Sequence, residues 1–182
     1  MAGYLKKATL LPLLALLASC ASPQQPQIAK LHNEVGKLNN EMQQLTEQAT
    51  ALTRQNMLNS SSTQGAWLLP ATNTAVPLQS QLGEVRLSLS HIESEANGTR
   101  AMLHIRSAGD NTLPAFTATV EWGELDPTSG KPLQVNSQSQ TFSVAASLLP
   151  RSEVTVPLRL SNLPPEQLGY VRVHDLMGQT KP

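Results

Sequence analysis

Phe116-Thr117-Ala118-Thr119-Val120-Glu121-Trp122 alternates apolar and polar residues along its whole length. A period of two is typical of a β-strand with one buried face. The same period recurs at residues 85–90, 103–106, 154–160 and 171–173, and more weakly at 66–69 and 134–144. Turn-forming residues separate these segments at intervals of about ten residues, without a βαβ rhythm. The pattern therefore predicts a mainly β domain over residues 66–178, an antiparallel β-sandwich of about seven strands.

Proline and glycine positions refine this prediction. Pro157 interrupts an otherwise regular strand, and because proline cannot donate to a ladder it predicts an edge strand. Asp126 and Pro127 begin a turn in which Gly130 supplies a positive φ. The run Leu-Pro-Pro-Glu-Gln-Leu-Gly-Tyr at 163–170 resembles the tyrosine corner of fibronectin-type sandwiches. That resemblance implies an immunoglobulin/fibronectin-like fold with Tyr170 at the corner.

The first hairpin has two possible registers. A two-residue turn at positions 97–98 would place Leu89 opposite Arg106. A three-residue loop at positions 96–98, with Gly98 left-handed, places Leu89 opposite Ile105 instead. Because a slip of one residue turns a whole strand face over, the match of apolar faces favours the three-residue loop.

Upstream of the β segments the period changes to seven, which predicts a long α-helix over residues 28–59. Asn56 and Asn59 end the apolar repeat, and the serine-rich residues 60–65 predict a flexible linker. The apolar seam has four heptad a positions and four d positions: Ile28, Val35, Met42 and Ala49 at a, and Leu31, Leu38, Leu45 and Leu52 at d.

Two surfaces could cover the seam: the chain's own β domain or the same helix of another copy. An amphipathic helix folded onto its own domain usually shows a wide apolar stripe, whereas a self-associating coiled coil shows a narrow one. Here every e and g position is polar, which favours a coiled coil and a homo-oligomer. The copy number stays open, since Met42 and Ala49 weaken the usual preference of such a seam for two strands.

The N-terminus has the organisation of a secretory signal peptide over residues 1–19. Lys6 and Lys7 form a basic head, and residues 8–18 form an apolar stretch. The closing run Leu17-Ala18-Ser19-Cys20 resembles the lipobox of bacterial lipoproteins. The resemblance implies cleavage before Cys20, S-diacylglycerol on its thiol and an N-acyl group on its new amine.

Residues that follow Cys20 extend this interpretation. Residues 20–27 form the lipidated N-terminus and a proline-containing tether. Ala21 stands where the lipoprotein pattern has aspartate when a protein stays in the inner membrane. The resemblance therefore implies the inner leaflet of the bacterial outer membrane, with the chain facing the periplasm.

The layout of the chain resembles two groups of lipoproteins. A leucine heptad helix shortly after a lipidated cysteine is similar to the murein lipoproteins of enteric bacteria, although Lys181 is penultimate here rather than C-terminal. The segments 64–70 (QGAWLLP), 87–93 (LSLSHIE), 120–127 (VEWGELDP) and 165–169 (PEQLG) resemble the YajI family of enterobacterial lipoproteins. That family is a domain of unknown function, so the resemblance implies a location and adds no chemistry.

Composition excludes several classes of function. The chain has 13 basic and 13 acidic residues, and loss of Lys6 and Lys7 leaves 11 and 13, a net charge of −2. A near-neutral chain without a basic cluster does not predict nucleic-acid binding. No stretch after the leader approaches the ~20 apolar residues of a membrane span. With Cys20 as the only cysteine, the mature chain forms no internal disulfide.

No motif in the sequence predicts catalysis. The chain has no GxSxG, HExxH or phosphate loop, and no cysteine–histidine pair. His104 and His174 fall on polar strand faces and His91 ends an apolar one, so we predict no metal site and no cofactor beyond the covalent lipid. Trp122 follows the phase of the core, while Trp67 is the aromatic residue available to stack on a sugar.

Three functional hypotheses follow. The leading one is a non-enzymatic envelope lipoprotein that presents its β domain to an unknown protein partner. The second is a peptidoglycan-binding or other glycan-binding lipoprotein, which rests on the location and on Trp67. The third is an enzyme with an unrecognised site.

Overall fold

The computed structural model describes residues 25–179, in which one helix precedes eight strands. The elements are α1 (Gln25–Ser60), β1 (Ala66–Leu68), β2 (Val76–Ser80), β3 (Gly83–Glu95), β4 (Gly98–Ser107), β5 (Phe116–Gly123), β6 (Gln138–Val144), β7 (Glu153–Ser161) and β8 (Tyr170–Gly178). Two compact units divide the chain, one ending at Gln44 and the other beginning at Leu45. The second unit therefore contains the last turns of α1 together with all the strands.

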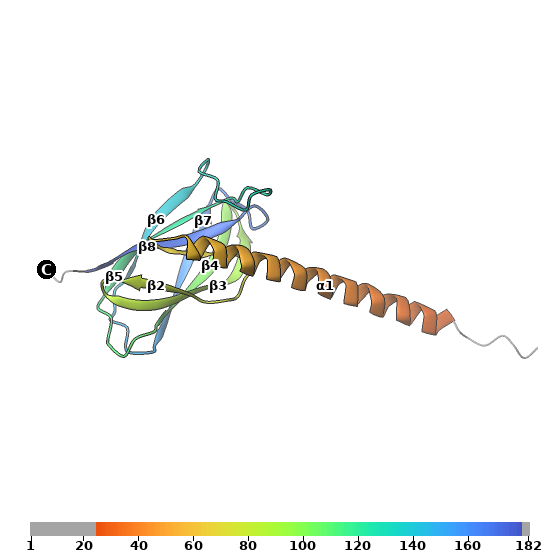
Figure 1. Cartoon of the computed structure of the whole chain (residues 1–182), viewed down its shortest axis with the longest axis horizontal. Coiled ribbons are helices and arrows are strands. Elements are labelled where there is room, and N and C mark those ends of the chain that lie inside the picture. The colour runs from red at the N-terminus through yellow and green to blue at the C-terminus, as the bar shows by residue number, and fades with distance from the viewer. Residues whose placement is uncertain (1–24, 180–182) are drawn as a thin grey trace, which may run out of the picture. The chain divides into compact units, whose positions relative to one another are not determined.

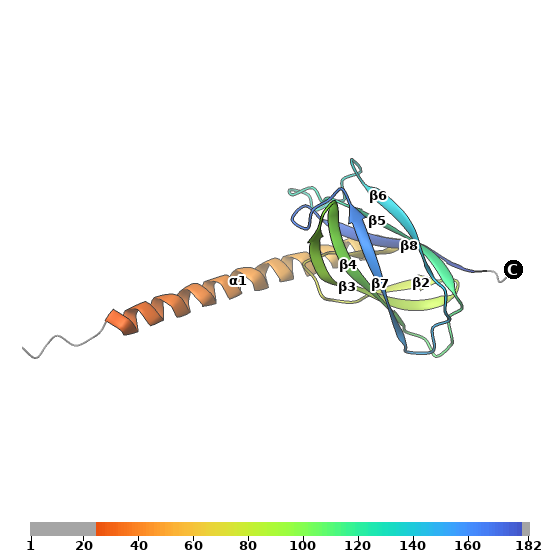
Figure 2. The ribbon, with the colours of Figure 1, turned by 180° about the vertical axis from the view of Figure 1, so that it is seen from behind.

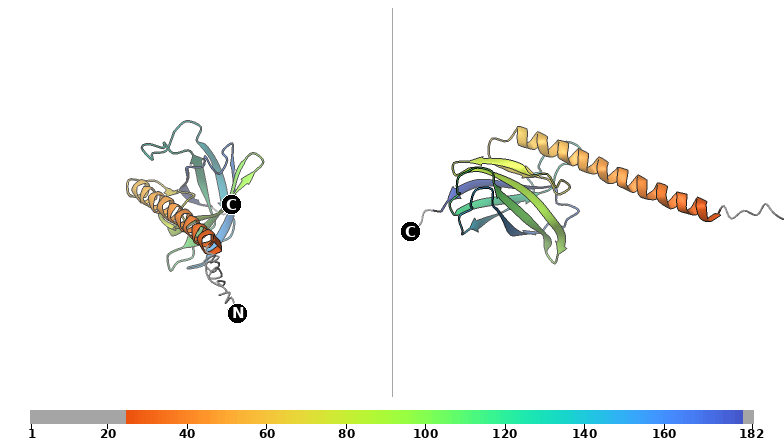
Figure 3. Two further views of the ribbon diagram at one scale, coloured as in Figure 1. Left: turned by 90° about the vertical axis from the view of Figure 1, so that its right-hand side faces the viewer. Right: turned by 90° about the horizontal axis from the view of Figure 1, so that it is seen from below.

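The strands form two four-stranded antiparallel sheets, in the orders β1-β8-β5-β6 and β2-β3-β4-β7 (Figures 1 and 2). The sheets lie face to face (Figure 3), and alternate side chains of each strand fill the space between them. Phe116, Val120 and Trp122 of the alternating segment are all buried in this core. The predicted β-sandwich after a long helix is confirmed. Strand β2 was not predicted, because its buried face is only Val76 and Leu78 and the residue between them is Pro77, which is rare inside strands.

Strand β1 lies where an immunoglobulin-type sandwich has its last strand. In that fold, the penultimate strand lies between the third strand and the last one. Here β8 lies between β5 and β1. The described chain contains no strand after β8, so the strand that opens the domain completes this sheet.

The predicted register of the first hairpin was wrong. Glu95 pairs with Gly98, so the turn has two residues, and a bulge lies between Ser90 and Glu93. The shorter turn and the bulge each move the register by one residue relative to the prediction. Together they place Leu89 opposite Leu103 instead of Ile105. The error is two residues, so the core face was assigned correctly. Gly98 has the expected positive φ, at +148°, and His91 at the bulge also has a positive φ, at +49°.

Two other local predictions agree with the structure. Strand β7, which contains Pro157, is the last strand of its sheet, as expected for an edge strand. Gly130 has a φ of +67°. The carboxylate of Asp126 accepts hydrogen bonds from the amides of Thr128 at 3.0 Å and Ser129 at 2.6 Å, and the bonds to Ser129 lower the pKa of Asp126 most.

The last turns of α1 pack on the outer side of the first sheet. Ala51, Leu69 and Tyr170 form a second apolar cluster there, bordered by Leu58, Trp67 and Leu125. Gln55, which the heptads place outside the apolar seam, is only 1% exposed. Residues 60–65 form a hydrogen-bonded connection in which the Ser61 hydroxyl donates to the Met57 carbonyl at 3.0 Å.

Tyr170 departs from the corner arrangement that its surrounding sequence resembles. A corner tyrosine donates to a backbone group a few residues upstream. Here the Tyr170 hydroxyl donates to Oε1 of Glu121 at 3.2 Å, and the ring lies in the cluster beneath α1. The resemblance therefore held for the fold and not for the role of the tyrosine.

Candidate interaction surface

The predicted apolar seam is exposed along α1. Six of its large side chains are 59–64% exposed: Ile28, Leu31, Val35, Leu38, Met42 and Leu45. Ala49 is exposed and Leu52 is half-buried. Such a row of exposed aliphatic side chains is a candidate contact surface.

The domain contact and the seam use different sides of the helix. Successive residues of an α-helix are turned by about 100°. At that spacing, Leu52 lies about 60° and Ala49 about 120° around the axis from the buried Gln55. The seam residues of the docked turns are therefore largely outside the contact with the sandwich, so both contacts can form on one helix.

The lipobox residues Leu17, Ala18, Ser19 and Cys20 lie outside the described residues. Within residues 25–179, α1 lacks the run of apolar residues that a bilayer span requires.

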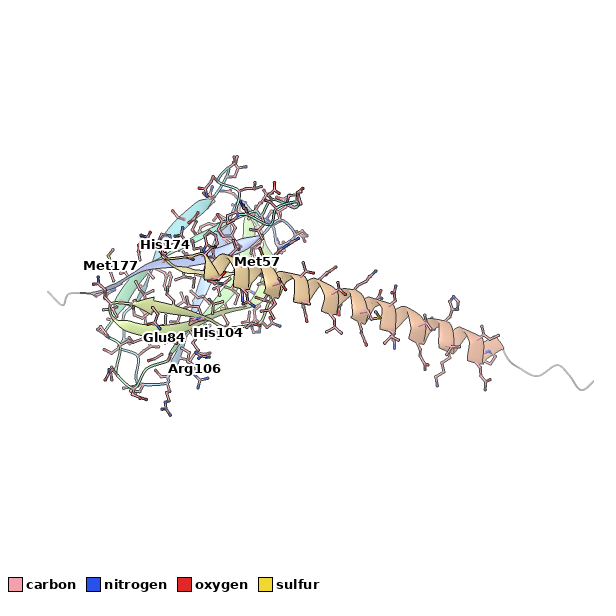
Figure 4. All side chains as sticks on the ribbon, viewed as in Figure 1. Met57, Glu84, His104, Arg106, His174 and Met177 are labelled. Carbon is pink, nitrogen blue, oxygen red and sulfur yellow. The ribbon has the colours of Figure 1, made fainter. Side chains whose placement is uncertain are left out.

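The three histidines of the β domain do not meet at one site, because His91 and His104 lie on neighbouring strands of one sheet and His174 lies on the other sheet. His104 belongs to β4 and His174 to β8, which are strands of different sheets (Figure 4). In the described part of the chain, no three His, Cys, Asp or Glu side chains are grouped to hold a metal ion.

Sequence reasoning missed a chain of hydrogen bonds across three strands. Ser90 Oγ lies 2.7 Å from His104 Nε2, and His104 Nδ1 lies 2.9 Å from Glu153 Oε1. Thr155 Oγ1 also lies 3.2 Å from His104 Nδ1, and His91 Nδ1 lies 2.8 Å from Ser90 Oγ. The register of β3, β4 and β7 brings these residues together, and no sequence motif links them.

The order hydroxyl, imidazole, carboxylate is that of a serine-hydrolase triad. However, Glu153 is 46% exposed and the group stands on the outer face of a sheet. At such an exposed position, water solvates and screens any charge that develops in a reaction. Hydrolases instead stabilise that charge with preorganised hydrogen-bond donors in an enclosed site. We therefore interpret the group as cross-strand hydrogen bonding.

A second polar group covers the outer face of the other sheet. Glu121 accepts hydrogen bonds from Tyr170 and from Arg172 Nη1, the latter at 3.3 Å, and His174 Nε2 lies 3.9 Å away. Burial, and then the nearby Glu121 carboxylate, raise the pKa of Tyr170.

The ring of Trp67 is already in contact with its own domain. The guanidinium of Arg172 lies 5.0 Å from the centre of the Trp67 ring, and the Tyr170 ring lies 5.0 Å away at 57°. A sugar stacked on Trp67 would have to compete with these contacts. Trp122, as expected, is buried in the core, and its indole N–H donates to the Ser161 carbonyl at 3.1 Å.

Two hollows flank the docked end of α1. The larger, of about 680 Å³, is lined mainly by small and apolar residues, including Thr50, Ala51, Leu69, Pro70 and Pro165. The other, of about 450 Å³, lies between Met57, Trp67 and Pro132, with Arg54 and Lys131 at its rim. Neither hollow is lined by the residues of the two polar groups described above, and Trp67 lines only the smaller one.

Comparisons with known proteins give consistent matches. A family model described as "Protein of unknown function (DUF3251)" matches residues 20–180. The chain is 39% identical over 167 residues to the uncharacterized lipoprotein YajI of Escherichia coli (strain K12), which covers 92% of this chain and 93% of the relative.

Two solved structures also match. The solution NMR structure of YajI has a TM-score of 0.69 at 38% identity and covers 74% of this chain and 80% of that chain. The trimeric lipoprotein SadB of Salmonella enterica has a TM-score of 0.54 at 18% identity and covers 86% of this chain and 84% of that chain. The SadB match shows a shared fold.

Proposed function

We propose, from the premise that this chain belongs to the DUF3251 family of proteins of unknown function, that it is an envelope lipoprotein without enzymatic activity. Acyl groups on Cys20 hold it in the inner leaflet of the outer membrane, and its β-sandwich is presented to a protein partner in the periplasm. The observation that carries this proposal is the lipobox at Leu17–Cys20. Its cysteine is also the residue at which the family match begins.

The lipid anchor has a direct physical basis. One acyl chain binds a membrane only marginally, while two or more anchor a protein stably, at about 0.8 kcal/mol for each buried methylene. S-diacylglycerol and an N-acyl group together supply three chains. Cys20→Ala should abolish incorporation of labelled palmitate and leave the uncleaved precursor, whereas continued labelling would refute the anchor.

The exposed seam supports self-association through α1. Burial of a Leu, Ile, Val or Met side chain stabilises a complex by about 1.5–3 kcal/mol, and six such side chains stand exposed on one helix. A second and a third copy of the same helix would cover them. SadB is a trimeric lipoprotein of the same fold, so we propose three copies.

Crosslinking in living cells tests whether the β domain binds a protein partner. Photo-crosslinking from exposed positions around the sandwich should recover a protein other than this chain at defined positions. Recovery of no foreign protein from any position would count strongly against the proposed function. Sedimentation with purified peptidoglycan tests the glycan alternative, which the contacts on Trp67 disfavour.

A further inference from the structure

The sandwich has four edge strands, and three of them are protected against pairing with another strand. An edge strand presents unpaired N–H and C=O groups, which proteins usually block with proline, charge, bulges or a cover. Strand β7 contains Pro157 and β2 contains Pro77. Strand β1 is three residues long, and the side chain of Asn59 bonds to the Trp67 backbone on it.

Strand β6 has none of these devices. Its seven residues, Gln138–Val144, include no proline and no charged residue, and they pair with β5 without a register shift. Within residues 25–179, no side chain or turn forms a hydrogen bond to its outer edge. In Figure 1, β6 runs along the upper margin of the sandwich.

Hydrogen bonds at the two ends of β5 show which β6 groups face outward. The carbonyls of Ala115 and Gly123 accept from the β8 side, whereas the carbonyl of Glu124 accepts from Leu133 on the β6 side. Because the direction alternates along a strand, the even-numbered residues of β5 bond to β6. The register pairs them with the even-numbered residues of β6. Ser139, Thr141 and Ser143 therefore direct their N–H and C=O groups to the free edge.

We propose that β6 is where the partner of this lipoprotein binds, by adding an extended strand to the sheet β1-β8-β5-β6. This proposal rests on the proposed function and names the surface that performs it. Main-chain hydrogen bonds to the three outward-facing residues would supply affinity, as in other cases of strand addition.

The side chains of β6 define the chemistry of the partner strand. On the inner face, Phe142 and Val144 belong to the core, so an added strand would continue that apolar face. On the outer face, Ser143 and Thr141 pair with Thr117 and Thr119, which makes a row of hydroxyl groups. The matching occupant is an uncharged segment of another protein that alternates apolar residues with Ser, Thr or Asn.

Thr141→Pro in the full-length lipoprotein tests the proposal. The substitution removes the central outward N–H and leaves the bonds to β5 in place, an arrangement that edge strands tolerate. Thr141→Val keeps the N–H and is the matched control. A photo-reactive residue at Ser139 or Ser143 reports contact at β6, and one at Arg159 reports contact at the protected edge β7. An unchanged melting temperature shows that the proline variant folds.

The expected result is a foreign-protein crosslink from β6, which Thr141→Pro lowers about tenfold and Thr141→Val leaves unchanged. In the recovered complex, the amides of Ser139, Thr141 and Ser143 should exchange more slowly than in the free chain. A β6 crosslink that survives Thr141→Pro overturns strand addition, and a β6 crosslink only to a second copy overturns the foreign partner. Foreign crosslinks confined to other surfaces overturn the site and leave the proposed function standing. An absence of foreign crosslinks from every position overturns both.

Discussion

The side-chain amide of Asn59 makes both hydrogen bonds that a neighbouring strand would make to Trp67. Its Nδ2 donates to the Trp67 carbonyl at 2.8 Å, and the Trp67 N–H donates to its Oδ1 at 2.9 Å. One turn earlier, Oε1 of Gln55 accepts from the Leu69 N–H at 2.8 Å. Four residues of helix rise about 6 Å and two residues of strand about 6.8 Å, so amides at i and i+4 match alternate strand residues. The end of α1 thus acts as an additional strand beside β1.

Loss of this amide should destabilise the sandwich. Asn59→Ala leaves the part-buried Trp67 N–H without its partner, and an unsatisfied donor that water cannot fully reach costs about 1–3 kcal/mol. The free energy of unfolding, measured by urea titration of the non-acylated chain from residue 21, should fall by about that amount. Asn56→Ala is the control, because Asn56 is exposed in the same turn. Equal effects of the two substitutions would contradict the strand-like role of Asn59.

Self-association should depend on the seam. Leu38→Glu places a charge in the seam. We expect light scattering to show a trimer for the unchanged chain from residue 21 and a monomer for this variant. Asn40→Glu adds the same charge at a polar heptad position and should leave the mass unchanged. An unchanged chain that is monomeric at high concentration would refute the coiled coil. A deletion that tests the same point has to stop at Gln44, because Ala51, Gln55 and Asn59 belong to the sandwich unit.

Two glycines should respond in opposite directions to alanine. A Cβ on Gly98 would collide with the Leu160 carbonyl of β7, and its φ is +148°. Gly98→Ala should therefore lower the free energy of unfolding by at least about 1 kcal/mol. A Cβ on Gly36 would meet no atom within 4 Å, and Gly36→Ala should raise helix content and stabilise α1 by about 1 kcal/mol. Circular dichroism melting of both variants checks the prediction, and a neutral Gly98→Ala would contradict the close approach of β4 and β7.

Alkaline pH should destabilise the fold through Tyr170. Its phenol is buried in the folded chain, which raises its pKa above the unfolded value of 10.0. The unfolded state then releases a proton that the folded state retains. Stability is therefore full below pH 10 and falls above it, by at most about 1.4 kcal/mol per pH unit.

Absorbance of tyrosinate measures this directly, because Tyr170 is the only tyrosine after residue 20. We expect the tyrosinate signal to appear together with unfolding, and Tyr170→Phe to flatten the alkaline stability curve. A phenol that titrates near its ordinary pKa in the folded chain would show that the pocket around it is open.

Ser90 should behave as an ordinary serine. On an open sheet face, its contact with His104 lacks the enclosed, preorganised donors that stabilise a developing oxyanion. A fluorophosphonate probe should label the chain no more than it labels Ser90→Ala, with Ser88→Ala as the control on the same strand face. Stoichiometric labelling that disappears in both Ser90→Ala and His104→Gln would establish a reactive serine and contradict a non-enzymatic lipoprotein.

The sequence by itself determined the elements whose causes are local. Alternation over 116–122 specified a strand and its buried face, Pro157 specified an edge, and Gly130 specified a turn, because each effect acts within a few residues. The heptads specified α1 and its seam in the same way. Cys20 and the residues before it predict the anchor without any reference to the fold.

Tertiary structure decided whatever depends on how distant segments pair. The register of β3 and β4 required a bulge at His91 that no residue pattern announces. In the sequence, Gln55 and Asn59 cannot be distinguished from exposed polar helix residues. Their hydrogen bonds to Trp67 and Leu69 exist only because the fold places these residues beside the helix. Likewise, only the sheet order leaves β6 as the unprotected edge. A pattern along the chain encodes burial and turn chemistry, whereas hydrogen bonds between segments depend on spacing in space, which one-dimensional periodicity does not specify.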